Sequence, residues 1–505
     1  MSKEIVSFLT VYHKARVTFA QTAAELVKQP RNIEALIQKE PGILELLRPL
    51  LLDIESSVQQ NAAKALGYIA GYSEQLAERV VSAEILPQLV YSLHNDNKQY
   101  KKSAAFVLRN VAKHNSILAN QVVLADAIEP LVECLEQFDP AVKESAALSL
   151  SNIAKHDESL AIAVVHADAI RLLLNCVDEP EIPLKIAALT ALSNISKHTG
   201  QLAQMIVDSE GISNIAPLIT HNKVKKYACL CLSNIAKHSE SLAEIVVEGE
   251  IFPMIFPLLA DPEDPIVRRN AATLIREIAK RSPELSALVS NAGGLPAIVN
   301  YVDSAEDDSK LPGIMCLGFI SAMTETLAAS VIKAKAIAPL GDTLSDPNSS
   351  DHVKSAAVWA LGQIGQHTTD HSRSVADLLP NLMDCYLSPR SSDDLVVKSE
   401  NAMIFIIQKC IHLPALAPLL HEQAPLKILK HVVAQYAKVL PNDQDARRKF
   451  AETKGLAKLQ IIHTDDDELR ESIQSINGCY PDEVVKFYSP NWDKEILNRI
   501  EDESA

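Results

Sequence analysis

RNVAKHNSILANQVV at residues 109–123 returns as SNIAKHDESLAIAVV at 151–165, SNISKHTGQLAQMIV at 193–207 and SNIAKHSESLAEIVV at 233–247. The apolar residue after the Asn anchors each copy, at Val111, Ile153, Ile195 and Ile235. Degenerate copies continue at Ile69, Ile278, Ile320, Ile364 and Ile407. Consecutive anchors lie 40 to 44 residues apart. A period of this length indicates a stack of helical repeats, each of which buries its apolar face on its neighbours.

One unit of the repeat reads as three helices of unequal length. Residues 121–127 form a short helical piece, and 128–138 form a second helix with apolar residues at helical spacing. Asp139-Pro140 opens a third helix, with Asp as the N-cap and Pro at the first helical position. Three unequal helices favour an armadillo unit over a two-helix HEAT unit. The predicted fold is therefore all-α: a right-handed superhelical armadillo solenoid of roughly ten three-helix repeats.

The ends of the chain deviate from the repeat, which divides it into four parts. We expect a worn N-terminal capping repeat at 1–50, armadillo repeats at 51–420, a C-terminal capping repeat at 421–463 and a non-repeat tail at 464–505. One leucine column should lie in the core between repeats, because its members hold the same position in the first helix of successive units. It comprises Leu76, Leu118, Leu160, Leu202, Leu242, Leu285 and Leu327.

Composition and charge restrict the classes of function. The net charge is −16 and aromatic residues are 5% of the chain, so neither a basic surface nor aromatic-basic interleaving points to nucleic acid. The start resembles no signal peptide, and the longest apolar run, IFPMIFPLLA, is broken by two prolines, so we expect no membrane span. Eight cysteines without metal-like spacing are expected to be reduced, buried thiols of a cytosolic protein.

The sequence contains no catalytic, cofactor or metal signature. Phosphate loop, dinucleotide fingerprint and nucleophile elbow are all missing, and His421-Glu422 lacks the second His of a metalloprotease helix. Residues 465–468 lack the Gly and terminal Glu of a calcium loop. His114, His156, His198 and His238 recur once per repeat, too far apart to share a metal. We predict a protein that is not an enzyme and uses no cofactor.

An asparagine column is the first candidate binding feature: Asn110, Asn152, Asn194 and Asn234. In armadillo families such as importin-α and β-catenin, a matching Asn points into the concave groove, where its amide can read the backbone of an extended peptide. Alternatively, each Asn tethers a neighbouring helix. Importin-α has a Trp one turn earlier, whereas only Trp359 is so placed here, beside Gln363. Nuclear import is therefore not expected.

A column of cations is the second candidate feature, ten residues before each anchor. Each cation sits in the first turn of its helix, where the helix dipole disfavours it, so another interaction should hold it there. It forms either inter-repeat salt bridges or a basic rail for an acidic partner such as tubulin. Lys223, Lys225, Lys226, Arg269 and residues 447–449 are further basic candidates. The column comprises Lys101, Lys143, Lys185, Lys225, Arg268, Lys310 and Lys354.

Aromatic residues gather after the repeat period is lost. Tyr480, Phe487, Tyr488 and Trp492 lie in a short part of an otherwise aromatic-poor chain. Aromatic side chains near a terminus usually anchor the segment. We expect them to dock on the chain's own last repeats, with a contact to a second copy as the alternative.

Several segments go beyond the generic repeat: YKKSAAFVLRNVAKH, TLIREIAK, ALGQIGQHTTDHSRSVA, ILKHVVAQYAKVLPNDQDARRKF and CYPDEVVKFYSP. With them the chain resembles the sperm-associated antigen 6 family, armadillo-repeat proteins of the central apparatus of cilia and flagella, over nearly its whole length. The resemblance implies a cytoplasmic, cytoskeletal protein of the motile axoneme. It would stabilise a central-pair microtubule and its projections, support normal beating, and contact tubulin, other central-apparatus proteins and copies of itself. The alternative is a soluble armadillo adaptor that binds extended peptides.

Overall fold

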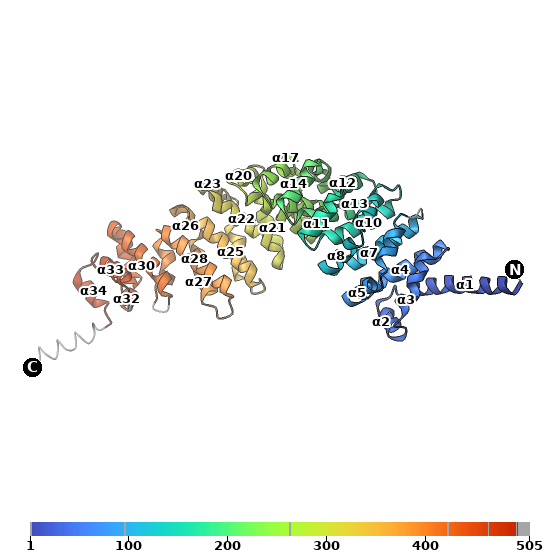
Figure 1. The fold of residues 1–505 in the computed structure, drawn as a ribbon. Coiled ribbons are helices and arrows are strands. Elements are labelled where there is room, and N and C mark those ends of the chain that lie inside the picture. The colour runs from blue at the N-terminus through green and yellow to red at the C-terminus, as the bar shows by residue number, and fades with distance from the viewer. Residues whose placement is uncertain are drawn as a thin grey trace, which may run out of the picture. The chain divides into compact units, whose positions relative to one another are not determined.

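The computed structural model describes residues 3–94, 97–261, 264–421, 424–462, 464–490 and 492, and its ordered elements there are all helices. The chain divides into two compact units, Met1–Met254 and Ile255–Ala505. Figure 1 shows each unit as a succession of short helices stacked in chain order. The all-α prediction is confirmed. The four predicted parts of the chain stay a prediction.

In the first unit, the third helices of successive repeats pack one on the next (Figure 1). They are α1 (Lys3–Leu26), α4 (Ser56–Tyr72), α7 (Lys98–Ala112), α10 (Pro140–Ala154), α13 (Ile182–Ser196) and α16 (Lys225–Ala236). Shorter helices flank this ladder: α2 (Pro30–Lys39), α3 (Ile43–Leu47), η1 (Arg48–Leu52), α5 (Glu74–Ser82), α6 (Leu86–Ser92), α8 (Ser116–Leu124), α9 (Ile128–Glu133), η2 (Cys134–Glu136), α11 (Glu158–His166), α12 (Ala169–Asp178), α14 (Gly200–Asp208), α15 (Gly211–Ile215), η3 (Ala216–Thr220) and α17 (Glu240–Glu248). Helix α18 (Phe252–Ile255) spans the division between the units.

The second unit has its own ladder of packed helices. They are α19 (Pro265–Ala279), α22 (Leu311–Met323), α25 (Asp351–Gly365), α28 (Asp393–Lys409), α30 (Leu426–Val439) and α33 (Asp467–Asn477). The flanking helices are η4 (Phe256–Ala260), α20 (Pro283–Asn291), α21 (Gly294–Ser304), η5 (Asp307–Lys310), α23 (Glu325–Lys333), α24 (Ile337–Ser345), α26 (Thr369–Val375), η6 (Ala376–Leu378), α27 (Leu379–Leu387), α29 (Leu413–Leu416), η7 (Ala417–Leu419), η8 (Leu440–Asn442), α31 (Gln444–Glu452), α32 (Gly455–Gln460) and α34 (Asp482–Phe487).

Helix starts follow the sequence signals closely. The Asp139 carboxylate accepts a hydrogen bond from the Ala141 N–H at 3.0 Å, as the N-cap prediction requires. The leucine column is buried, as predicted. Three residues before each of these leucines, a polar side chain accepts the leucine N–H and so starts the first helix. These caps are Ser73, Asn115, Asp157, Thr199, Ser239, Ser282 and Thr324.

From α5–α6 to α23–α24, each of the seven turns between a first and a second helix contains a residue with positive φ. Left-handed backbone is costly for side chains other than glycine and asparagine. Here only Gly293 is a glycine, and the other positions carry charged residues, so no glycine signal marks these turns in the sequence. The positions are Glu84, Asp126, Asp168, Glu210, Glu250, Gly293 and Lys335.

The Lys-His pair of the repeated phrase connects each repeat to the one before it. His156 Nε2 lies 2.7 Å from the carbonyl oxygen of Ala112, the last residue of α7, and Lys155 Nζ donates to the Lys113 carbonyl at 2.7 Å. The last carbonyl groups of an α-helix have no partner within that helix. A repeat that carries this pair therefore caps the third helix of its predecessor.

The same contact recurs along both units. In the first unit, His114 reaches the carbonyl of Ala70, His198 that of Ala154 and His238 that of Ser196, at 2.6 to 2.7 Å. In the second unit, His367 reaches the carbonyl of Ser321 at 2.7 Å. We call these contacts the histidine ladder. The polar atoms of Lys155 and His156 thus bond to the neighbouring helix and not to their own.

Burial favours the neutral form of two histidines of this ladder. It lowers the pKa of His114 and of His156, with the nearby lysines adding to the effect, although the backbone carbonyl and a nearby carboxylate oppose it. In the unfolded chain these side chains would titrate near 6.5. Below that pH the unfolded state takes up more protons than the folded state, which makes folding less favourable.

We predict that the free energy of unfolding decreases as the pH falls from about 7.5 through about 6.5 toward the lowered histidine pKa values. Urea unfolding followed by helical circular dichroism at several pH values measures it. A variant with His114→Gln and His156→Gln should show a shallower pH dependence. Other histidines with a lowered pKa, such as His371 and His431, would leave a residual slope. An unchanged slope would contradict the assignment.

Candidate interaction surface

The asparagine column lies on the third helices, and three of its four amides donate to the preceding repeat. Asn152 Nδ2 donates to the Arg109 carbonyl at 3.1 Å. Asn194 donates to Ser151 Oγ at 3.0 Å, and Asn234 to Ser193 Oγ at 2.9 Å. Asn110 instead donates to the Phe106 carbonyl of its own helix, at 2.9 Å. These contacts are those of inter-repeat tethers, and capture of a peptide backbone by the same amides stays a prediction.

The cation column is engaged with the fold, and all seven side chains are buried or half-buried. Lys143 forms a salt bridge with Glu179 in the following repeat. Lys185 donates to the Val177 carbonyl near the end of α12, and Arg268 Nε donates to the Leu259 carbonyl in η4 at 2.9 Å. A cation in the first turn of one helix thus compensates the negative end of another. That the column forms a basic rail for a partner stays a prediction. These intramolecular contacts leave the side chains less available to a partner protein.

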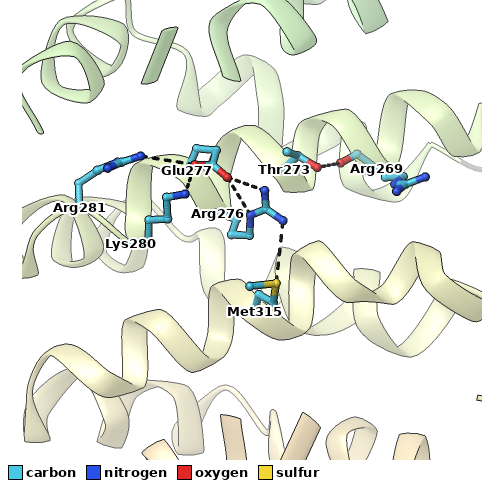
Figure 2. Close-up of polar contacts among 7 residues, drawn as sticks. All are labelled: Arg269, Thr273, Arg276, Glu277, Lys280, Arg281 and Met315. Carbon is cyan, nitrogen blue, oxygen red and sulfur yellow. Dashed lines mark hydrogen bonds and ion pairs between the residues drawn. The ribbon is translucent and has the colours of Figure 1, made fainter. Parts of the chain in front are cut away.

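Glu277 occupies the position of the asparagine column in the second unit. It precedes the anchor Ile278, as Asn152 precedes Ile153, and its side chain is buried. Figure 2 shows three cations converging on this carboxylate. Arg276 donates to Glu277 Oε1 through Nε at 3.1 Å, Lys280 pairs with Oε2, and Arg281 Nη2 lies 3.7 Å from Oε2. The sequence predicted Arg268 and Arg269 as candidates but not Glu277. Alignment of the repeats would have placed Glu277 at the asparagine position.

The Glu277 carboxylate is ionised at neutral pH. Burial alone would raise its pKa, but the ion pairs with Lys280 and Arg276 outweigh burial and lower the pKa below its ordinary value. Arg276, Lys280 and Arg281 surround it, and Arg269 lies two turns before Arg276 on the same helix. We call these five residues the α19 cluster, which carries four cations and one carboxylate. On a chain of net charge −16, it is a local concentration of positive charge.

An aromatic pair follows the α19 cluster on the next two third helices. Phe319 of α22 and Trp359 of α25 meet edge to face, with ring centroids 5.0 Å apart. Gly318 leaves room for the indole, because a Cβ there would lie 2.2 Å from Trp359 Cζ3. In the first unit, Tyr68 and Phe106 meet at 5.3 Å over Gly67 in the same register. Each pair forms an aromatic shelf on the third-helix surface.

The C-terminal aromatics lie near α31 and α33. The Tyr480 hydroxyl donates to the Arg447 carbonyl of α31 at 2.8 Å. Phe487 contacts Tyr488 and Trp492, with centroids 5.1 and 6.4 Å apart, and its side chain is exposed. The predicted anchoring role of these four aromatics on the last repeats stays a prediction.

The sequence also predicts that the chain has no catalytic site, no metal site and no membrane span. Within the described ranges, no group of three His, Cys, Asp or Glu side chains is arranged to hold a metal ion. Glu422 of the His421-Glu422 pair lies outside the described residues. No single described helix is long and apolar enough to cross a bilayer; two bent pairs, α11 with α12 and α20 with α21, reach that limit by length and composition alone. All eight cysteines are free thiols, and seven are buried.

Comparison with known proteins defines the class. Residues 157–197 match the Armadillo/beta-catenin-like repeat family, and residues 353–382 match the PBS lyase HEAT-like repeat family. Among solved structures, an engineered protein superimposes with a TM-score of 0.68 at 22% identity, covering 86% of this chain and 98% of its own. At that identity the likeness concerns the fold alone. The chain is an armadillo-repeat protein.

Two curated relatives define the family within this class. Sperm-associated antigen 6 of Mus musculus is 52% identical over 502 residues, which cover 99% of this chain and 98% of the mouse protein. Sperm-associated antigen 6 of Homo sapiens is 52% identical over 154 residues, 30% of each chain. The chain belongs to the sperm-associated antigen 6 family.

We predict that Gly318→Ala lowers the free energy of unfolding by about 1–3 kcal/mol, because the added methyl displaces the Trp359 indole. Urea unfolding monitored by tryptophan fluorescence measures the change. Gly478→Ala is the matched control, since its nearest neighbour would lie 3.5 Å away, and it should be neutral or stabilising by up to about 1 kcal/mol. Equal effects of the two substitutions would contradict the close packing at the shelf.

Proposed function

We propose that this protein is a structural scaffold of the axoneme of motile cilia and flagella, which stabilises a central-pair microtubule and its projections and is required for normal beating. The observation that carries the proposal is the 52% identity to mouse sperm-associated antigen 6 over 99% of the chain. The repeat array supports it, because stacked helices of this kind present extended surfaces to other proteins.

The proposed partners are proteins: tubulin, other components of the central apparatus, and copies of the same chain. The armadillo fold and the family suggest a non-enzymatic protein. The net charge of −16 opposes contact with an acidic microtubule surface, so direct binding to tubulin would use local basic sites such as the α19 cluster. The proposed location is the cytoplasm, in the axonemal cytoskeleton.

We predict that a tagged copy concentrates along motile cilia that contain a central pair and is lost from cilia that lack one. Fluorescence microscopy of both kinds of cilium in one organism tests this. Cosedimentation with purified microtubules then separates direct from indirect attachment. Uniform cytosolic signal in both kinds of cell would contradict the axonemal role and favour a soluble adaptor. Charge reversal of Lys143 or Lys185 would not be a clean test of microtubule binding, because both side chains form contacts that stabilise the fold.

We also propose that helix α1 mediates contact with a second copy. Phe8, Leu9 and Tyr12 are 54 to 75% exposed on the N-terminal half of this helix. Exposed apolar side chains at helical spacing are typical of a helix–helix interface.

We predict that the full chain self-associates and that Phe8→Glu, by placing a charge in the apolar contact, shifts it toward the monomer. Light scattering coupled to size-exclusion chromatography over a concentration series measures the mass. Phe138→Glu is the matched control, because Phe138 is also exposed but lies in a loop away from α1. A monomer at every concentration, or equal effects of both substitutions, would contradict the proposal.

A further inference from the structure

The α19 cluster has more hydrogen-bond donors than acceptors. Arg276 uses Nε and Nη2 on Glu277, but its Nη1 meets only the Met315 sulfur, at 4.0 Å. A thioether is a weak acceptor. Arg281 Nε is buried without a hydrogen-bond partner, and Arg269 is exposed with only its backbone carbonyl engaged, by Thr273 Oγ1 at 2.7 Å. One carboxylate therefore satisfies only part of the cluster.

Two of the partly unsatisfied side chains, Arg269 and Arg276, share one strip of the surface. Arg269, Thr273 and Arg276 are spaced i, i+4 and i+7, which places them on one face of α19. Figure 2 shows them in this order, with Met315 of α22 opposite Arg276. Four residues after Met315 comes Phe319, the first ring of the aromatic shelf. The strip thus runs from guanidinium groups to a half-buried aromatic pair within the second unit.

We propose that this strip binds an acidic segment of a partner protein, with Asp or Glu carboxylates on Arg269 and Arg276 and an apolar side chain on the Phe319–Trp359 shelf. Guanidinium groups form charge-assisted, bidentate hydrogen bonds with carboxylates. In the first unit, the asparagines at the Glu277 position are neutral and tether neighbouring repeats, so they give no comparable anion site. The inference rests on the proposed function only in requiring a protein partner.

Glu277 gives this binding mode a distinctive consequence. Its carboxylate occupies Arg276, Lys280 and Arg281 in the unbound protein, so it competes with an incoming carboxylate. Neutralising Glu277 should strengthen binding of an acidic segment, while removing Arg269 should weaken it. Overall charge alone could also give effects of opposite sign, so a matched arginine elsewhere in the second unit is needed as a control.

The experiment titrates the full-length protein into a fluorescein-labelled peptide of twelve glutamates and follows fluorescence anisotropy at low salt. We expect Arg269→Gln to weaken binding roughly tenfold, the effect of losing one charge-assisted contact. Glu277→Gln should tighten binding several-fold. Arg390→Gln, which removes another exposed arginine of the second unit, and a peptide of twelve glutamines serve as controls.

Equal weakening by Arg269→Gln and Arg390→Gln would overturn the site, because it would indicate attraction by overall charge. Unchanged or weaker binding by a Glu277→Gln variant that melts like the parent would overturn the competition. Thermal unfolding of every variant excludes loss of fold as the cause. Localisation to the central pair is measured separately, by microscopy. The proposed peptide-binding site can therefore be disproved without contradicting the axonemal role.

Discussion

Every α-helix ends with carbonyl groups that its own backbone cannot satisfy. In a stack of short helices, every layer has such unpaired carbonyl groups, and they lie close to the neighbouring helix. Here His156 and Lys155 reach back across more than forty residues of sequence to the end of α7, and the same contact repeats at His114 and His198. Each repeat that carries this histidine completes the helix before it, so the stability of that layer depends on the presence of the next.

This arrangement separates residues that connect the repeats from residues that depart from the repeat. Side chains that hold neighbouring repeats together turn inward, as the amides of Asn152, Asn194 and Asn234 and the side chain of Lys143 do. The proposed partner site lies where the repeat departs from its pattern. Glu277 and its cations replace an asparagine tether, and Trp359 places a half-buried ring over Gly318. The repeated residues hold the helices together, and the residues that depart from the repeat give it distinct charged and aromatic groups.

The periodic features were predictable from the sequence because helical spacing follows from backbone geometry. Asp139 as an N-cap, the buried leucine column and the buried cysteines are examples. The reach of His156 into the preceding repeat was not predictable, since a 42-residue spacing does not state which atoms face each other across a layer. The left-handed turns at Asp126 and Lys335 lack the glycine that would have marked them.

Hydrogen exchange measured by mass spectrometry on His156→Gln tests the dependence of each repeat on the next most directly. We expect faster exchange at the end of α7, around Ala112, although the substitution lies 44 residues away in the sequence. The third helix that contains Ile153 should change less. Faster exchange confined to residues around 156, with the end of α7 as protected as in the parent chain, would contradict it.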